Sequence, residues 1–382
     1  MIALVVTIVV LLILSAVAIG LSVGDNGIIT SARNATDQWE QGVANEQDEL
    51  KQIANFINGN TSSGGEKTTV ADVVGGDKFE QTETIEDDNG KEVTIPKGFG
   101  VAEDSNTVVD EGIVITDGTN EFVWVPVDDP STMFIEGTAK LNGVGTTTNI
   151  YSKLKIRDED TEIDTTGKPG ESEKVREPDV LSNYDTDSSY YKTILDFDST
   201  KEMADSIVAE YKAMSDSVKK YHGFYIGRYE LTGTVDKPTE KAGKVLTAST
   251  AGNWYNLYKA CQNVIKNNSD VKSTMIYGCQ WDETCSWLEK NGYDINDSSD
   301  WGNYNSNRKE TGSDPSYKAN EIFDLAGNLF EWTQEACSSN YRIARGGVFR
   351  DSGSSFPVSD RRLSLPYNSD FINTSRAVLY IS

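Results

Sequence analysis

The sequence is poor in the side chains that carry much protein chemistry. Among 382 residues there is one histidine, His222, which excludes a histidine-rich metal site, a two-histidine zinc motif and a catalytic dyad placed elsewhere. His222 directly precedes a predicted strand, and a role at the entry to that strand is favoured over one as a general base. The cysteines include no CxxC pair and are too few for a disulfide scaffold. One or two disulfides and free buried thiols both remain open for Cys261, Cys279, Cys285 and Cys337.

Basic side chains are also scarce. Lys and Arg number 35 against 60 Asp and Glu, which gives a formal net charge of −25. Nucleic-acid binding relies on clustered Lys and Arg that neutralise phosphates, so this balance argues against a nucleic-acid partner. A hydrophobic content of 37%, with 17 Tyr, 12 Phe and 7 Trp, is enough for a packed core. The chain is therefore not disordered throughout.

A long apolar run opens the sequence. Residues 1–24 carry no charge, and 2–21 are almost wholly Val, Ile, Leu and Ala. As a helix, such a run spans about 30 Å, the thickness of the hydrocarbon core of a bilayer. It lacks the basic n-region of a cleavable signal. The run is followed by a single apolar helical stripe, which ends at Asn58-Gly59 and consists of Trp39, Val43, Leu50, Ile53 and Ile57.

This pattern over residues 1–58 resembles the N-terminal helix of type IV pilins and pseudopilins. The resemblance implies a mature chain whose 1–24 segment lies in a membrane or filament core, with other pilin subunits or the membrane as partners. It also implies a location outside the cell, at the cell surface or in a pilus. Val5 stands where the family usually has a glutamate, which favours a minor or tip subunit. The Asn-, Ser- and Gly-rich residues 59–76 are predicted to be a flexible linker.

The middle of the chain predicts strands, an insertion and a helix. Turn residues at Asp88-Asn89-Gly90 and Asp117-Gly118 each separate two β-rich runs, which is typical of hairpins. A charged insertion is expected near 131–215, because residues 153–182 within it are dense in Lys, Asp and Glu and have few apolar anchors. Helical spacing of apolar residues appears over Lys201–Tyr221.

Motifs in the C-terminal half resemble a known domain family. The sequence DLAGNLFEWT at 324–333 is followed by Arg345-Gly346-Gly347, and EFVWVPV at 121–127 matches a first strand. Together they resemble the formylglycine-generating, sulfatase-modifying domain, a C-type-lectin-like fold. The predicted fold class is therefore α+β, with a long N-terminal helix followed by a C-type-lectin-like domain over 77–382.

The resemblance also makes chemical predictions. The oxidising members carry a copper-binding cysteine pair shortly after the Gly-Gly turn, but no thiol follows Gly347 here. We therefore expect no catalysis, no copper and no organic cofactor. The family's structural calcium site maps onto Asp324 and Glu331 through their side chains and onto Gly327 and Leu329 through their carbonyl groups. Hard oxygen ligands suit Ca²⁺, so calcium is a possible ligand of this loop.

The tract 347–373 is predicted to bind a ligand. It mixes aromatic and Arg side chains with small polar residues and shows little strand alternation, which is typical of recognition loops. A strand at 375–381 closes it. The layout is similar to the variable proteins of diversity-generating retroelements, which implies that the tract is diversified. The candidate ligand-binding residues are Phe349, Arg350, Asp351, Phe356, Ser359, Asp360, Arg362, Leu365, Tyr367, Asp370 and Phe371.

The sequence thus predicts a surface-displayed, non-catalytic, adhesin-like protein. Its tract would bind an unidentified protein or glycan, and its N-terminal helix would anchor it. Two alternatives are a surface enzyme of the sulfatase-modifying type and a structural type IV pilus subunit. The missing cysteine pair argues against the first, and Val5 argues against the second.

Overall fold

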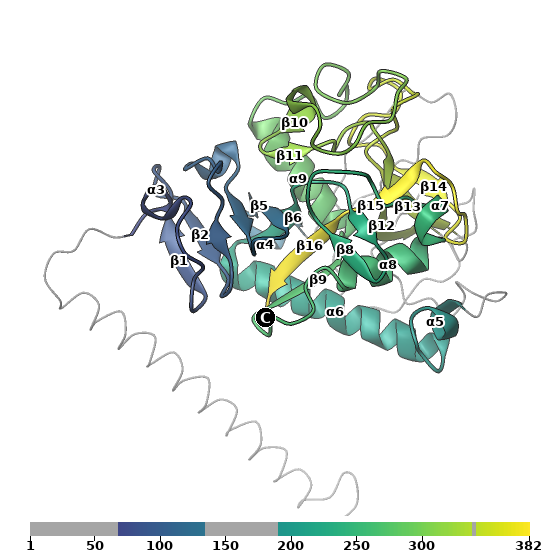
Figure 1. The fold of residues 1–382 in the computed structure, drawn as a ribbon, viewed down its shortest axis with the longest axis horizontal. Coiled ribbons are helices and arrows are strands. Elements are labelled where there is room, and N and C mark those ends of the chain that lie inside the picture. Colours follow the sequence, from purple (N-terminus) through teal and green to yellow (C-terminus); the bar gives the residue numbers. More distant parts are fainter. Residues whose placement is uncertain (1–67, 134–189, 338–340) are drawn as a thin grey trace, which may run out of the picture. The chain divides into compact units, whose positions relative to one another are not determined.

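The computed structural model describes residues 68–133, 190–337 and 341–382, which belong to a unit spanning Lys67–Ser382 (Figure 1). The predicted pilin-like helix at 1–58 lies outside these residues, as does most of the charged insertion. Within the described ranges, no helix is both long and apolar enough to span a bilayer. The mixture of helices and small sheets confirms an α+β class.

The helices of the described residues range from single turns to one of 22 residues. The α-helices are α3 (Val70–Val73), α4 (Pro130–Met133), α5 (Tyr190–Thr193), α6 (Thr200–Tyr221), α7 (Ala248–Ala251), α8 (Trp254–Gln262) and α9 (Gly278–Lys290). The 3₁₀ turns are η1 (Val109–Glu111) and η2 (Pro315–Tyr317).

The strands are short, and most belong to two sheets. The first, antiparallel and six-stranded, has the order β3 (Gly100–Val101), β4 (Val114–Thr116), β5 (Glu121–Pro126), β6 (Gly223–Gly227), β16 (Ala377–Ile381) and β9 (Val271–Met275). The second has the order β14 (Arg362–Ser364), β13 (Tyr341–Arg345), β12 (Phe330–Cys337) and β15 (Asn373–Ser375). Two-stranded pairs are β1 (Glu83–Glu86) with β2 (Glu92–Ile95), β7 (Thr232–Thr234) with β8 (Lys237–Thr239), and β10 (Lys318–Ala319) with β11 (Ile322–Phe323).

The six-stranded sheet is covered on both faces. Trp124, Tyr225 and Leu379 belong to one buried cluster, which also contains residues of α8. Val125 and Ile226 point to the other face and belong to a cluster with residues of α6 and α9. Because side chains alternate along a strand, cover on both faces requires continuous apolar runs such as those of β5 and β16.

The C-terminal strand pair joins the two sheets. Strand β15 pairs with β12 in parallel, and β16 follows directly to pair with β6 and β9 in the large sheet. In Figure 1 the yellow end of the chain runs from one sheet into the other. Residues 347–372, between β13 and β15, are therefore held at both ends by strands.

The local predictions are largely confirmed. Both hairpins form, with Glu83–Glu86 facing Glu92–Ile95 and Val114–Thr116 facing Glu121–Pro126. The helix predicted at 201–221 is α6, which Ser199 caps by accepting a hydrogen bond from the Glu202 N–H at 3.1 Å.

Two predicted boundaries are wrong. The linker was expected to reach residue 76, but Val70 of α3 is fully buried in the core. The charged insertion was expected to reach residue 215, but α6 buries Met203, Ile207 and Met214 there. Val70 is a single apolar residue in a polar segment, and composition averaged over a window does not detect it. At 201–215 the boundary drawn from composition overlapped the helix that the apolar spacing predicted, and the structure favours the helix.

Candidate functional site

The Arg-Gly-Gly turn after β13 starts the candidate site. Gly346 and Gly347 have φ angles of 88° and 79°, in the left-handed region that favours glycine. A Cβ at Gly347 would lie 2.3 Å from the carbonyl oxygen of Phe356. The turn thus packs backbone on backbone, which fixes where the tract 347–373 leaves the sheet.

A closed ring of four charged side chains lies beneath the tract. Arg345 donates to Asp282 at 2.8 Å and to Glu335 at 3.0 Å. Arg361 donates to Glu335 at 2.9 Å and also to Asp282. All four side chains are 0% exposed. We call these four residues the ion ring; it is neutral overall and ties α9, β12 and β13 to the tract.

A β-bulge positions one member of the ion ring. The pairing of β12 with β13 shifts register between Trp332 and Ala336. Within this shift Glu335 donates its backbone N–H to the hydroxyl of Thr333 at 3.1 Å instead of to the ladder. Burial alone would raise the pKa of Glu335, but Arg361 and Arg345 outweigh it and hold that pKa below its usual range. Glu335 is therefore ionised in the ring.

The tract above the ring is only partly exposed. Arg350, Asp370, Tyr367 and Phe371 are exposed, with exposed fractions of 55% for Tyr367 and 51% for Phe371. These two are the large hydrophobic residues that stand exposed in the described part of the chain. The half-buried members are Phe349, Asp351, Phe356, Arg362 and Leu365.

Two predicted binding residues are buried. Ser359 and Asp360 are each 2% exposed, so the prediction of an exposed tract is wrong at these positions. They immediately precede Arg361, and their backbone enters the interior with it. Burial raises the pKa of Asp360 to about 6, although Arg345 and Arg362 partly offset the shift.

Two arginine side chains of the tract lie over aromatic rings, one within the tract and one in β12. Arg350 lies 5.9 Å from the ring centre of Phe371, and Arg362 lies 4.4 Å from that of Phe330. Such cation–π contacts contribute about 0.5–1 kcal/mol at exposed sites. Of the two exposed aromatic residues, Phe371 is thereby oriented by a neighbouring arginine.

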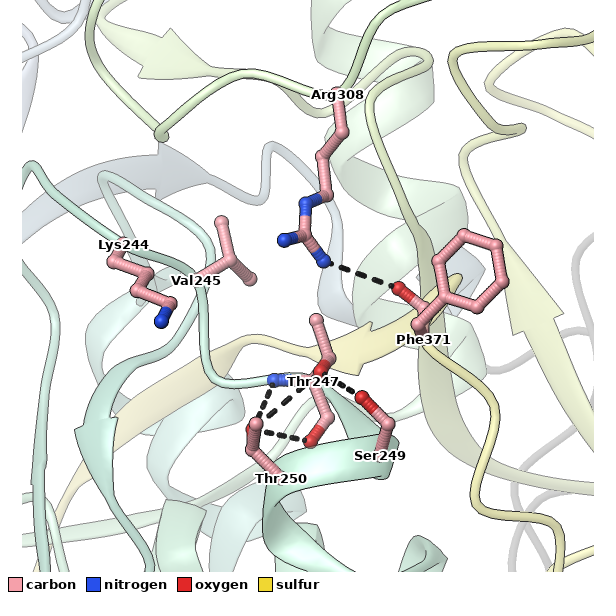
Figure 2. Close-up of a pocket in the computed structure, with 7 residues that line it drawn as sticks. All are labelled: Lys244, Val245, Thr247, Ser249, Thr250, Arg308 and Phe371. Carbon is pink, nitrogen blue, oxygen red and sulfur yellow. Dashed lines mark hydrogen bonds between the residues drawn. The ribbon is translucent and has the colours of Figure 1, made fainter.

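A pocket of about 440 Å³ adjoins the tract at Phe371. Figure 2 shows the guanidinium of Arg308 pointing toward the hydroxyls of Thr247, Ser249 and Thr250. Lys244 and Val245 lie on one side of Arg308, and Phe371 lies on the other. Arg308 also donates to the Phe371 carbonyl oxygen at 3.4 Å. The pocket draws on the segment before α7, on the start of α7, on the loop around 308 and on the tract. Lys244 and Arg308 were not predicted as site residues, because no local sequence pattern brings them together.

The residues of the predicted calcium loop do not fit a calcium site. Glu331 is bound by Arg376 at 2.7 Å, and both side chains are 0% exposed. A guanidinium thus lies where a cation would bind. One oxygen of Asp324 accepts from the Thr311 hydroxyl and the Gly312 N–H, each at 3.0 Å. In the described residues, no group of three or more His, Cys, Asp or Glu side chains could hold a metal ion.

The same loop instead packs backbone against backbone. A Cβ at Gly327 would lie 2.3 Å from the carbonyl oxygen of Asn303, and Leu329 is fully buried. Asn328 accepts at 3.0 Å from both the Asn303 side chain and the Lys309 N–H, and it donates to Glu230. The motif 324–331 therefore fixes the position of the loop around 303–312, which carries Arg308.

Several buried carboxyl groups surround Arg376. Burial, reinforced by Asp324 and Glu331, raises the pKa of Glu230 well above its usual range. Burial likewise raises the pKa of Glu240, which accepts from the Ala377 N–H at 2.7 Å. Burial raises the pKa of Asp324 to about 6. Arg376 lowers these pKa values, but one guanidinium is shared among several acids and does not offset their burial. Burial therefore favours the protonated forms of these acids.

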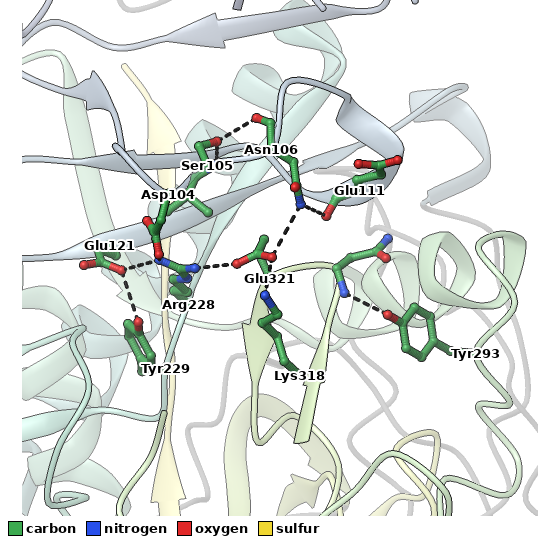
Figure 3. A network of polar contacts seen from close by, with 12 residues as sticks. Asp104, Ser105, Asn106, Glu111, Glu121, Arg228, Tyr229, Tyr293, Lys318 and Glu321 are labelled. Atoms are coloured by element: carbon green, nitrogen blue, oxygen red, sulfur yellow. Dashed lines mark hydrogen bonds and ion pairs between the residues drawn. The ribbon is translucent and has the colours of Figure 1, made fainter. Parts of the chain in front are cut away.

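A second polar network surrounds Arg228, the residue that directly follows β6 (Figure 3). Arg228 donates to Glu121 at 2.8 Å, to Asp104 at 3.0 Å and to Glu321. Lys318 also pairs with Glu321. The carboxylates of this network are bound by protein cations, so its role is to hold the β10–β11 turn against the large sheet.

The remaining candidates have structural roles. Cys261, Cys279 and Cys285 are buried thiols, whereas the side chain of Cys337 lies outside the described residues. His222 ends α6 in the left-handed conformation (φ 54°), and its carbonyl accepts from the Val127 N–H at 2.8 Å. It therefore stands at the entry to β6, as predicted.

The chain has similarity to solved structures but not to a protein-family model. No protein-family model matches the chain, and no curated protein matches it. Among solved structures, the chain is similar to Treponema denticola variable protein 1, with 16% sequence identity and a TM-score of 0.29. The match covers 41% of this chain and 84% of that one.

Proposed function

We propose that this chain is a non-catalytic ligand-binding protein that acts outside the cell, on a surface or in a pilus. Residues 1–58 would contact a membrane or other pilin-like subunits. Residues 77–382 would form a C-type-lectin-like platform whose tract 347–373 binds a protein or glycan. By resemblance, the exposed positions of the tract would differ between variants of the protein.

The proposal depends chiefly on the position of Tyr367 and Phe371. Both are more than half exposed, and in the described residues they are the large hydrophobic side chains that remain so. Exposed aromatic anchors beside Arg are enriched where proteins bind partners. Two such side chains on one short tract offer rigid apolar contact area to a partner, which favours a binding role.

The support beneath the tract favours binding as well. The ion ring enters the tract at Arg361, and Ile372, next to Phe371, is 7% exposed. Each anchor thus lies within a few residues of a buried side chain. Such preorganisation lowers the entropy lost when a ligand orders the surface.

The test uses the full chain and an immobilised panel of purified glycans and extracellular-matrix proteins. We expect the double variant Tyr367→Ala/Phe371→Ala to lose at least tenfold in affinity for any panel member that binds. Its Tm should stay close to that of the wild type, because exposed substitutions change stability by about 0.5 kcal/mol or less.

Phe79→Ala is the matched control, since Phe79 is a half-buried aromatic residue outside the tract. It should lose stability and keep affinity. Undiminished binding by the double variant, or no binding to the panel, would overturn the proposal.

A further inference from the structure

The pocket beside Phe371 combines two cations with three hydroxyl groups. We infer that this pocket binds the carboxylate-bearing sugar of an acidic glycan. Lys244 and Arg308 would hold the carboxylate, the exposed hydroxyls of Ser249 and Thr250 would meet sugar hydroxyls, and the Phe371 ring would cover an apolar sugar face. The buried Thr247 would hold Ser249 in place. This inference rests on the proposed function, because Phe371 belongs to both sites.

The charge of the pocket is the first support. Across residues 68–133, 190–337 and 341–382, no acidic side chain pairs with Lys244 or Arg308. Several lysines elsewhere do pair with an acid, such as Lys290 with Asp128 and Lys309 with Asp314. A chain with a net charge of −25 offers many acids, so two unpaired cations facing one pocket favour an anionic ligand. The planar fork of Arg308 suits a carboxylate, which accepts two parallel hydrogen bonds.

The hydroxyl groups favour a sugar over an acidic peptide. Thr247 shares a hydrogen bond with Ser249 at 2.9 Å, and the Thr250 hydroxyl donates to the Thr247 carbonyl at 2.9 Å. The Thr250 hydroxyl also accepts from the Thr247 N–H at 3.1 Å, so its donor is used, and Thr247 itself is buried. A hydroxyl has one donor and two acceptor positions, so the exposed Ser249 hydroxyl keeps the most capacity for a ligand and Thr250 can only accept. Sugar hydroxyls both donate and accept and can therefore pair with either group, whereas the carboxylate side chains of an acidic peptide only accept and its donors are confined to the backbone.

The size and the aromatic wall agree with this choice. A volume of about 440 Å³ lies within the range of about 300–1,000 Å³ that is usual for small-molecule sites. Phe371 is 51% exposed, so one part of its ring packs on the protein and another part stays available. Aromatic rings provide rigid apolar contact area of the kind that the C–H face of a sugar needs.

Trigalacturonate, neutral galactotriose, hexaglutamate peptide and sodium sulfate are titrated against the full chain by calorimetry. We expect trigalacturonate to bind at least tenfold more tightly than galactotriose, because only the acidic sugar engages both cations. Lys244→Gln and Arg308→Gln should each weaken it tenfold or more. The control Lys241→Gln removes an exposed lysine three residues away and should leave the affinity unchanged.

The outcomes separate this inference from the proposed function. Equal affinity for hexaglutamate, binding of sulfate alone, or trigalacturonate binding that survives both pocket variants would overturn the inference. If Tyr367→Ala abolishes binding to the panel while the pocket variants do not, the proposed surface stands and the acidic-sugar pocket fails. If the pocket variants alone abolish trigalacturonate binding, the pocket stands whatever Tyr367→Ala does.

Discussion

Removing Arg361 tests whether the ion ring holds the tract in place. In the neutral ring, Arg361 faces Asp282 and Glu335, with every side chain 0% exposed. Arg361→Met keeps much of the side-chain volume but leaves two carboxylates with the single cation Arg345. The ring would then carry an uncompensated negative charge away from water.

The cost follows from the burial of these groups. Breaking a buried ion pair by removing one partner destabilises a protein by about 3–5 kcal/mol. That is a large part of the total stability of a typical domain, which is about 5–15 kcal/mol. At about 2 °C per kcal/mol for a large domain, we expect the Tm to fall by roughly 6–10 °C.

Urea denaturation followed by tryptophan fluorescence measures the loss. Arg362→Met is the matched control, because its side chain is 40% exposed and lies over Phe330. It should cost only about 0.5–1 kcal/mol, the value of an exposed cation–π contact.

A rescue variant separates charge from packing. Arg361→Met/Asp282→Asn restores neutrality through the remaining Arg345–Glu335 pair and should recover about half of the lost stability, since neighbouring changes are non-additive. Equal losses for Arg361→Met and Arg362→Met, or no recovery in the double variant, would refute the reasoning.

Three further predictions address the motif loop, the thiols and the turn. Asp324→Asn can keep both hydrogen bonds, which reach a single oxygen, and asparagine tolerates the left-handed backbone (φ 55°). Because the folded pKa of about 6 exceeds the unfolded value, the stability contributed by Asp324 is full below about pH 4 and is lost as the pH rises through about 6. In the variant, the denaturation midpoint should vary less with pH across that window, and the free energy of unfolding at pH 7 should rise by up to about 2–3 kcal/mol. A midpoint that rises with added calcium in the wild type but not in the variant would instead support the calcium site. In a Cys337→Ser background, Cys261, Cys279 and Cys285 should resist a thiol reagent until denaturant is added, because all three are buried. Burial also raises the pKa of Cys285 to about 12, which disfavours the reactive thiolate, and labelling of the folded protein in buffer would contradict this burial. Gly347→Ala should cost at least about 2 kcal/mol by melting temperature, because the φ of 79° and the contact with Phe356 both oppose a Cβ, whereas Gly90→Ala meets only the strained φ.

Local signals accounted for most elements that the structure describes. Asp88-Asn89-Gly90 and Asp117-Gly118 mark turns whatever surrounds them, since they favour the required backbone angles. The apolar spacing of Met203, Ile207 and Met214 predicted α6, because the period of a helix is a local property of the sequence. The strand at the C-terminus followed from a continuous apolar run, which suits a strand buried on both faces.

The buried charges could not be predicted in the same way. Asp282, Glu335, Arg345 and Arg361 come from four separate segments, and charged residues are usually exposed, so their sequence context suggested solvent. The bulge that places Glu335 depends on the pairing of β12 with β13. No local signal marks either acid, since Glu283 follows Asp282 and Thr333-Gln334 precede Glu335, so both lie among polar neighbours.

The alternation of buried and exposed residues would let one short tract serve both the stability of the fold and the proposed binding role. Arg361 points into the ion ring while Arg362 lies over Phe330, and Ile372 is buried while Phe371 is exposed. A tract of free loops would lose conformational entropy on binding, about 1–2 kcal/mol for each residue that becomes ordered. Here the folding of the domain has already fixed the backbone through neighbouring buried residues. The exposed side chains can therefore be exchanged without a change in the fold, which is the property that a variable binding surface requires.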